Sequence, residues 1–528
     1  MKRYCIIPAL VLLSSASWAQ NLNPEVQVTN DYQNRIDDVS KKGVAMTIPD
    51  SLLRFDYHFD YSVFDSPYKG AYEFSPYSVT ITPDARPYDG RRLYLRAGAG
   101  YVLKPEFDLV WSAVDRKKFS VNAFASAGGF YGNYKHVQPD TFVREKGVFD
   151  RGWDFASSVG ADARINIGKT LLRTEFGYDG IYTGHDIYSG GNTHSPYVSA
   201  HIGSNSGRRI LYNAGVTYRY VYDALSSGSS IHENELTLDA VFSAVTDASF
   251  KVSSDVELNL NGYYSAFQMH PHAAFRLGAF DFDAGLRFGG YTGKVTLSPA
   301  VTVAAHLLHD YLDVYAGADG GNRNLTYWDY RSGEHWYHAD YLEPLPLREI
   351  ADLFGGFRGH ADFGLQYDVK AGYRFLRNAP FWAVGDWGYE TMRFQDCRAV
   401  HADLLLSWAS ERLNVDGELH YMHIPGGVDD GVFSPSAVTS TFRGSYNWKK
   451  RIFAGLSMDM ATGRKALAGP AEVKMPGYAD VGLWGEYRLD GRLSLWLKCS
   501  NILNQDIRTS PLISECGPAV IAGIRFSL

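Results

Sequence analysis

The stretch 250–264, FKVSSDVELNLNGYY, alternates between apolar and polar side chains. One set is mostly apolar: Phe250, Val252, Ser254, Val256, Leu258, Leu260, Gly262 and Tyr264. The other set is mostly polar: Lys251, Ser253, Asp255, Glu257, Asn259, Asn261 and Tyr263. Because successive side chains of a strand point to opposite faces of a sheet, the pattern predicts a strand with one apolar and one wet face. The apolar face would meet lipid in a membrane barrel or the core of a soluble sandwich, and one strand does not decide between them.

The same alternation recurs along the chain. It is found at 210–223, 282–290, 360–369, 400–409 and 412–421. Such weak but repeated period-two segments are typical of membrane-spanning β-barrels. The 14% of aromatic residues and the 52 glycines also suit a β structure with many turns and aromatic belts at the membrane interfaces.

Short polar turns divide these segments on one side of the expected sheet. They lie at 114–118, 166–170, 205–209, 245–249, 280–283, 307–310, 378–381, 409–412, 447–451 and 489–492. The connections on the other side are longer, at 132–150, 183–194, 223–231, 319–358, 424–435, 461–477 and 502–516. Two strands precede the first turn and each turn introduces two more. We therefore expect an all-β, antiparallel transmembrane barrel of about 22 strands, within a range of 18–22, with short periplasmic turns and longer extracellular loops.

The N-terminus predicts export. Residues 1–19 combine Lys2 and Arg3 with a short apolar run and small residues, which is the pattern of a signal peptide. No later run is long and apolar enough for a membrane helix. The net charge of -7 argues against a nucleic-acid binder. The expected divisions are the signal peptide 1–19, a periplasmic N-terminal segment 20–88, and the barrel 89–528.

Segment 20–88 is rich in Tyr, Phe, Pro and Asp. It is too short for a sizeable globular domain and too aromatic for a free tail. We expect it to dock either on the periplasmic mouth of the barrel or on another protein. Outside the signal peptide, the cysteines Cys397, Cys499 and Cys516 form no disulfide framework. Cys499 and Cys516 fall on neighbouring expected strands, where a disulfide and free thiols are equally compatible with the sequence.

The C-terminal stretch 493–512, LSLWLKCSNILNQDIRTSPL, resembles the penultimate strand of TonB-dependent receptors. There an amphipathic strand runs into an Asn-Leu-Leu/Phe-Asn motif, here Asn501-Ile502-Leu503-Asn504. The stretches 314–324 and 48–77 resemble receptor-type barrels of Bacteroidota. The resemblance covers about 89–528 and implies a 22-strand outer-membrane barrel. Such receptors also carry an N-terminal plug domain longer than 20–88, so we expect a barrel without a standard plug.

One expected loop contains an aromatic cluster. The candidate binding surface comprises Trp328, Tyr330, His335, Trp336 and Tyr337. Three interpretations remain open: a surface for carbohydrate, lipid or a partner protein, a self-packed constriction loop, or a metal site. The candidate metal ligands are Glu334, His335, His338 and Asp340. Charged residues expected on the lumen face could tune a pore or pair across it. They are Arg219, Asp239, Asp255, Glu257, Arg287 and Asp368.

Two functions fit these features. The first is a receptor-like barrel that transports or binds a solute across the cell outer membrane. The second is a non-transporting barrel subunit of a larger secretion or assembly complex. We expect no enzyme, since no nucleophile, base and orienting group converge in the sequence. We also expect no cofactor, no nucleic-acid partner, contact with outer-membrane lipid, and a possible outer-membrane or periplasmic protein partner on 20–88.

Overall fold

The alternating stretch forms strand β9 (Phe250–Leu260) in the computed structural model, where it pairs antiparallel with its two neighbours along the chain. The structure describes residues 92–116, 118–136, 149–185, 191–204, 209–224, 230–247, 250–308, 311–336, 343–384, 390–468, 471–508, 513–515 and 517–528. The expected signal peptide 1–19, the segment 20–88, Tyr337 and Cys516 lie outside these residues.

In the part of the chain that the structure describes, twenty-two strands form the barrel. They are β1 (Leu93–Tyr101), β2 (Glu106–Arg116), β3 (Phe119–His136), β4 (Phe149–Ile167), β5 (Thr170–His185), β6 (Asn192–Ser204), β7 (Ile210–Ala224), β8 (Ser230–Asp247), β9, β10 (Ser265–Leu277), β11 (Phe280–Tyr291), β12 (Lys294–Leu308), β13 (Leu312–Arg323), β14 (Leu347–Ala361), β15 (Leu365–Val384), β16 (Glu390–Ala409), β17 (Leu413–His423), β18 (Val438–Trp448), β19 (Ile452–Ala461), β22 (Tyr478–Arg488), β23 (Leu493–Ser500) and β25 (Ala519–Ser527). Three further strands lie outside this wall: β20 (Arg464–Ala468) and β21 (Ala471–Met475) form a hairpin, and β24 (Ile513–Glu515) pairs with the end of β3.

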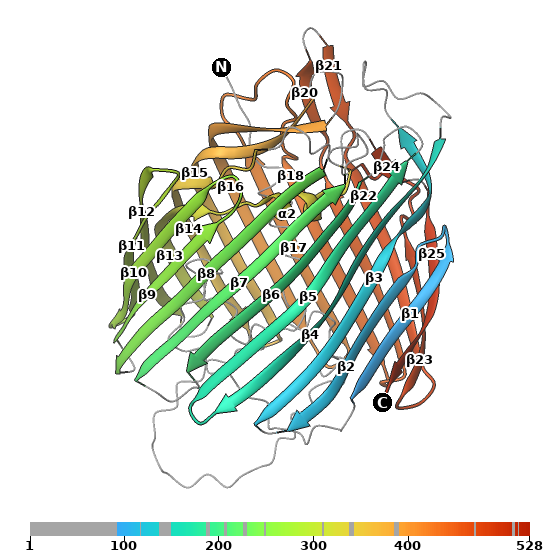
Figure 1. Ribbon diagram of the computed structural model, residues 1–528, viewed down its shortest axis with the longest axis horizontal. Coiled ribbons are helices and arrows are strands. Elements are labelled where there is room, and N and C mark those ends of the chain that lie inside the picture. Colours follow the sequence, from blue (N-terminus) through green and yellow to red (C-terminus); the bar gives the residue numbers. More distant parts are fainter. Residues whose placement is uncertain are drawn as a thin grey trace.

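Each barrel strand pairs antiparallel with the strands before and after it, and the sheet closes on itself (Figure 1). Closure runs from Tyr94 opposite Ser527 to Tyr101 opposite Val520, between β1 and β25. The expected all-β antiparallel barrel and its 22 strands are confirmed. Closure leaves no strand edge among these 22 strands with unpaired backbone groups, which is the condition for a sheet to cross hydrocarbon.

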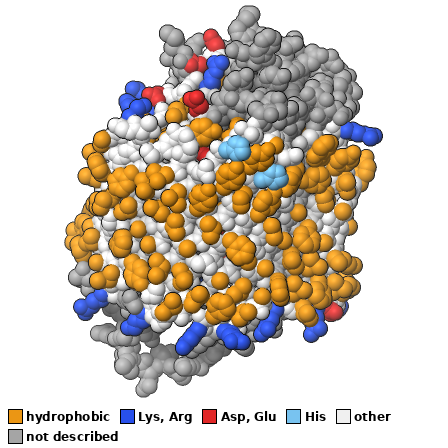
Figure 2. Space-filling view, in the orientation of Figure 1, with side chains coloured by type: hydrophobic (Ala, Val, Ile, Leu, Met, Phe, Trp, Pro, Cys, Tyr) orange, Lys and Arg blue, Asp and Glu red, His pale blue; other side chains and the backbone are white. Residues whose placement is uncertain are grey.

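The outer surface of the barrel is apolar. On the face seen in Figure 2, hydrophobic side chains form a broad band between two polar rims. In β9, Val252 is 44% exposed whereas its neighbour Ser253 is 4% exposed. The alternation therefore places apolar side chains outside and polar side chains inside, the reverse of a soluble β-sandwich. Among the described residues, no helix is long and apolar enough to cross a membrane.

Most expected turns lie where the sequence predicts them. The exception is 378–381, which is wrong: these residues belong to β15, and the turn between β14 and β15 is at 362–364. Asn378 has a φ of 50° and lies at a register shift against β16, so the stretch Asn378-Ala379-Pro380 marks a β-bulge. The turn expected at 280–283 lies at 278–279, and the long connection expected at 319–358 is limited to 324–346 because β13 and β14 extend into it.

Beyond this bulge, β15 and β16 continue as a hairpin that bends across the loop end of the barrel, near β20 and β21 (Figure 1). Phe433 donates a backbone hydrogen bond to Trp382 and bridges to Ala466 of β20. Buried apolar residues join the hairpin to three other connections. They include Leu325, Tyr327, Phe381, Trp382, Phe433 and Met475. The loop end of the barrel therefore has its own apolar core, separate from the lipid-facing band.

Candidate functional site: a loop folded into the lumen

Residues 324–336, the described part of the connection that follows β13, fold into the barrel, and we call them the lumen loop. It carries the short helix α2 (Tyr327–Gly333), which Figure 1 shows within the outline of the barrel. Thr326 caps the helix by accepting from the backbone N–H of Asp329, and the Asp329 carboxylate accepts from the backbone N–H of Thr326. This reciprocal pair satisfies donors that a helix start otherwise leaves open. The helix thus begins at a defined residue.

A buried carboxylate of the wall holds the helix in place. Asp223 of β7 is 0% exposed and accepts from the hydroxyl of Tyr327 at 2.5 Å. The Nε of Arg331 lies 3.0 Å from the same carboxylate and donates to Thr193 of β6 at 2.9 Å. Glu233 of β8, also 0% exposed, accepts from the backbone N–H of Tyr327. Three adjacent strands therefore hold this part of the helix through hydrogen bonds and one ion pair in a buried setting, where such interactions are strong.

The lumen loop also contacts the part of the β15–β16 hairpin that bends across the loop end. Tyr330 is 3% exposed, and its ring packs edge-on against Phe394 of β16, with 6.2 Å between the ring centroids. The lumen loop begins at the end of β13, and the ring of Trp336 contacts Tyr134 of β3, which is ten strand positions from β13 around the 22-strand barrel. The lumen loop therefore spans the barrel near its loop end.

Four of the five candidate binding residues are used in these attachments. Trp328 lies against Arg219, whose guanidinium is 4.7 Å from the Trp328 ring centroid. His335 pairs with Asp154 of β4 at 2.6 Å, and Trp336 packs edge-on against Tyr134 at 5.2 Å. These contacts, with that of Tyr330, agree with the interpretation of a self-packed constriction loop. Ligand binding by these residues and by Tyr337 stays a prediction, as does the metal site that included His338 and Asp340, which lie outside the described residues.

Burial shifts the ionisation of the charged groups on the lumen loop. Burial raises the pKa of Asp329, although its hydrogen bonds from Thr326 act in the opposite direction. Burial also raises the pKa of Glu334 against the hydrogen bond from the Trp336 backbone. For His335, burial lowers the pKa, but the charge of Asp154 and its hydrogen bond outweigh burial and raise the pKa overall. Because these pKa values differ from the ordinary ones, the free energy that holds the lumen loop in place is expected to depend on pH.

All six charged residues expected in the lumen have polar partners. The pairs are Arg219 with Asp179, Asp239 with His201, Asp255 with His270, Glu257 with Asn324, Arg287 with Asp319, and Asp368 with Tyr315. Asn324 donates to Glu257 at 2.6 Å, so Glu257 holds the lumen loop just before α2. The structure therefore brings Arg219 and Glu257 together with the lumen loop, whereas the other four pair with residues of the wall.

Sequence reasoning missed a series of histidine–aspartate pairs on the wall. They join His270 to Asp255, His272 to Asp283, His306 to Asp281 and Asp313, and His401 to Asp352 and Asp403. One signal was available: His270 and His272 are two residues apart on an alternating strand, which puts both on one face. Among the described residues, Asp255, His270 and His272 are the group placed closely enough to share a metal ion.

Comparison with known proteins gives matches among solved structures. No protein-family description and no curated protein matches the chain. The siderophore receptor PirA from Acinetobacter baumannii matches with a TM-score of 0.60 and 9% identity, over 83% of this chain and 80% of that chain. The FrpB iron transporter from Neisseria meningitidis matches with a TM-score of 0.60 and 11% identity, over 83% and 81%. The copper transporter OprC matches with a TM-score of 0.59 and 13% identity, over 83% and 81%.

At these identities the likeness concerns the fold. It agrees with the architecture implied by the resemblance to TonB-dependent receptors, and it extends over most of the barrel of this chain. The chain therefore shares the barrel fold of these receptors and transporters.

Proposed function

We propose that the chain is an outer-membrane barrel that binds or passes a solute, and that the lumen loop sets the width of the passage. A barrel of about 22 strands encloses a wide lumen unless something fills it. The observation that carries the proposal is the attachment of Tyr327 and Arg331 to the fully buried Asp223. A buried ion pair between this helix and the wall fixes the position of the lumen loop, because breaking the pair leaves a charge buried without a partner.

The same proposal covers the parts that the structure does not describe. Residues 1–19 direct export, and 20–88 take the place of a full plug domain in a receptor-type barrel of Bacteroidota kind. The solved neighbours are named for siderophore, iron and copper transport. These names favour a small solute over the alternative of a barrel subunit in a secretion or assembly complex. The proposal involves no catalytic step.

Single-channel recording in planar lipid bilayers tests the role of the lumen loop. Arg331→Ala should raise conductance and current noise, because it leaves Asp223 buried without its cationic partner, at a cost of about 3–5 kcal/mol. Replacing 326–336 by a Gly/Ser linker of equal length should raise conductance further. Both variants keep every strand of the barrel wall.

The matched control is Arg443→Ala. It removes an arginine from a more exposed ion pair with Asp459, between β18 and β19. Its conductance should equal that of the unchanged protein. Heat-modifiable migration in gels shows whether each variant is folded. If the folded Arg331→Ala and linker variants have the same conductance as the unchanged protein, the lumen loop does not control the passage.

A further inference from the structure

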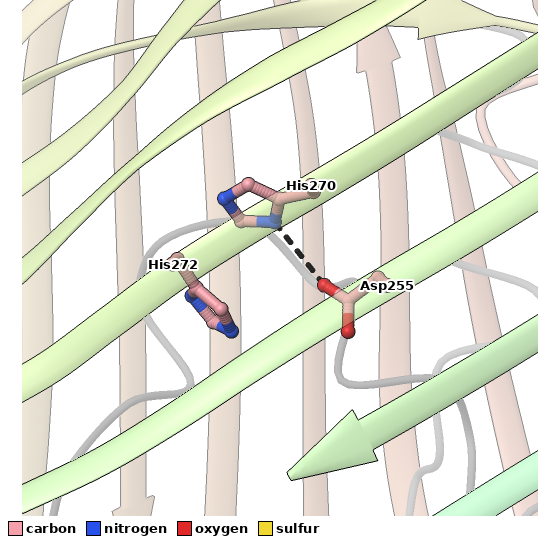
Figure 3. Close-up of side chains that lie close together, drawn as sticks. All are labelled: Asp255, His270 and His272. Carbon is pink, nitrogen blue, oxygen red and sulfur yellow. Dashed lines mark hydrogen bonds and ion pairs between the residues drawn. The ribbon is translucent and has the colours of Figure 1, made fainter.

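Three side chains on the inner wall lie close together where β9 and β10 pair. Asp255 of β9 is directly opposite His270 of β10, and His272 is two residues further along the same face. One potential ligand atom from each residue lies within 4.8 Å of the other two. Figure 3 shows the His272 imidazole beside the pair formed by Asp255 and His270, with one ring nitrogen on the Asp255 side.

Hydrogen bonds orient two of the three groups. The Nδ1 of His270 is 3.1 Å from Oδ2 of Asp255, and the two imidazole centroids are 4.4 Å apart. The Nδ1 of His272 is 3.0 Å from Oδ1 of Asp283 on β11. The second oxygen of Asp255, Oδ1, is buried and has no hydrogen-bond partner among the described residues. A cation between these groups would therefore find one carboxylate oxygen that is not already used.

Asp283 is not one of the three grouped residues, but it orients the imidazole of His272. When His272 donates its Nδ1–H to Asp283, its Nε2 is left with a lone pair. A carboxylate behind a ligating histidine is the usual arrangement in metal sites, because it sets the tautomer and makes the imidazole more basic. The Asp283–His272 pair therefore presents one nitrogen in the state that a metal needs.

The wall leaves room for both imidazoles. Gly285 of β11 is directly opposite His272. A Cβ at position 285 would lie 2.5 Å from the Cβ of His272 and 3.0 Å from the Nε2 of His270. Any larger residue would displace the rings, so glycine at this position is part of how the wall accommodates them.

The electrostatics favour a cation. Asp255 and Asp283 are two carboxylates, and Lys251, on the same strand and face as Asp255, interacts with both. One ammonium against two carboxylates leaves one negative charge to attract a metal ion. Two imidazoles and one carboxylate suit divalent cations of intermediate softness, whereas Mg²⁺ and Ca²⁺ require oxygen ligands.

We propose that Asp255, His270 and His272 form a binding site for a divalent transition-metal cation, with Zn²⁺, Cu²⁺ and Ni²⁺ as the fitting ions. The cation binds His270 as the neutral imidazole: for ligation through Nδ1 the proton now shared with Asp255 moves to Nε2, and an imidazole that is protonated beforehand releases one proton to solvent. Bonds of about 2.1 Å place tetrahedral ligand atoms about 3.4 Å apart, so modest side-chain rotation from the present spacing completes the site. Three protein ligands leave a fourth position open to water or to a solute in the lumen. The site does not depend on the proposed role of the lumen loop in conduction.

Metal titration of the purified full-length protein in detergent tests this inference. The protein is stripped with a chelator, dialysed and titrated with ZnCl₂ in competition with a fluorescent zinc indicator. We expect one saturable equivalent that is lost in both His270→Gln and His272→Gln. Asp283→Asn keeps all three ligands and should weaken binding by about 10- to 100-fold, the usual loss when a supporting carboxylate is removed.

The matched control is His201→Gln. His201 is also a histidine of the barrel wall and lies 3.9 Å from Asp239, outside the cluster. It should bind zinc as the unchanged protein does. Cu²⁺ added in place of Zn²⁺ should give nitrogen hyperfine structure in its electron paramagnetic resonance spectrum that His272→Gln reduces. Unchanged zinc stoichiometry and affinity in folded His270→Gln, His272→Gln and Asp283→Asn, or no binding by the unchanged protein, would overturn the proposal.

Discussion

His335 is a single titratable residue that helps to attach the lumen loop to the wall. Its imidazole contacts Asp154 on β4, and its backbone carbonyl accepts from Arg331. The raised pKa means that the protonated imidazole is more stable in the folded protein than in the unfolded chain. His335 therefore strengthens the attachment of the lumen loop below its ordinary pKa of about 6.5, and the contribution is lost as pH rises through the higher folded pKa.

Conductance should accordingly rise with pH. Asp329 and Glu334 act in the same direction, because a carboxyl whose pKa is raised by burial becomes destabilising when it ionises. Bilayer recordings from about pH 6 to about pH 9 should show a wider or noisier channel at the alkaline end. His335→Gln should reduce this dependence. A conductance that falls with pH, or a dependence that His335→Gln leaves intact, contradicts the assignment.

At the scale of the strand, the depth of a lipid-facing residue in the membrane decides how much a charged side chain destabilises the barrel. Leu286 is near the middle of β11 and 52% exposed on the outer face, while Leu277 ends β10 beside a turn and is 61% exposed. Leu286→Arg should destabilise the barrel by about 2–4 kcal/mol and Leu277→Arg by about 0–1 kcal/mol, because the cost falls towards the interface. Urea unfolding in lipid vesicles measures both. Equal losses would mean that the apolar band is not the lipid-facing surface.

The strands could be predicted from the sequence because their signal is local. The alternation within 250–260 is enough to assign each side chain to one of the two faces of the strand, and the number of expected turns, ten, gives the correct number of strands. The stretch Asn378-Ala379-Pro380 was misread because the same residue types suit a turn and a bulge, and only the pairing with the neighbouring strands distinguishes the two. The attachment of the lumen loop to the wall could not be predicted from the sequence in this way. Trp328 lies over Arg219, and Arg331 pairs with Asp223, across separations that no local pattern encodes.

For the whole molecule, the end of the barrel that carries the short turns, which we call the turn end, is strongly basic. In Figure 2, Lys and Arg side chains project along the rim opposite to the β20–β21 end. Exposed basic residues at or beside the described turns are Arg92, Arg116, Lys118, Lys169, Arg209, Arg412, Lys449, Lys450, Arg451 and Arg492. Segment 20–88 carries ten acidic and six basic residues. Opposite charges therefore favour the expected docking of this segment on the turn end.

Deleting 21–88 separates the two roles that this segment could have. If it seals the lumen from the periplasmic side, the shortened barrel should carry large steady currents and make cells sensitive to bulky antibiotics. If it docks a partner protein, conductance should stay low while co-purifying proteins are lost. Because exposed aromatic surface costs about 25 cal/mol per Å², one of these outcomes is expected. No change in either measurement would refute both roles.

The pairing of β1 with β25 has a consequence for how the protein is made. The first strand of the wall finds its second neighbour in the last strand of the chain, Tyr94 opposite Ser527. Until β25 has been made and has reached β1, the sheet has two open edges, whose amide and carbonyl groups hydrocarbon does not accept. Stable insertion therefore requires the complete wall. A chain that ends before residue 519 lacks the strand that closes the wall, however little of its length is missing, and should not insert stably.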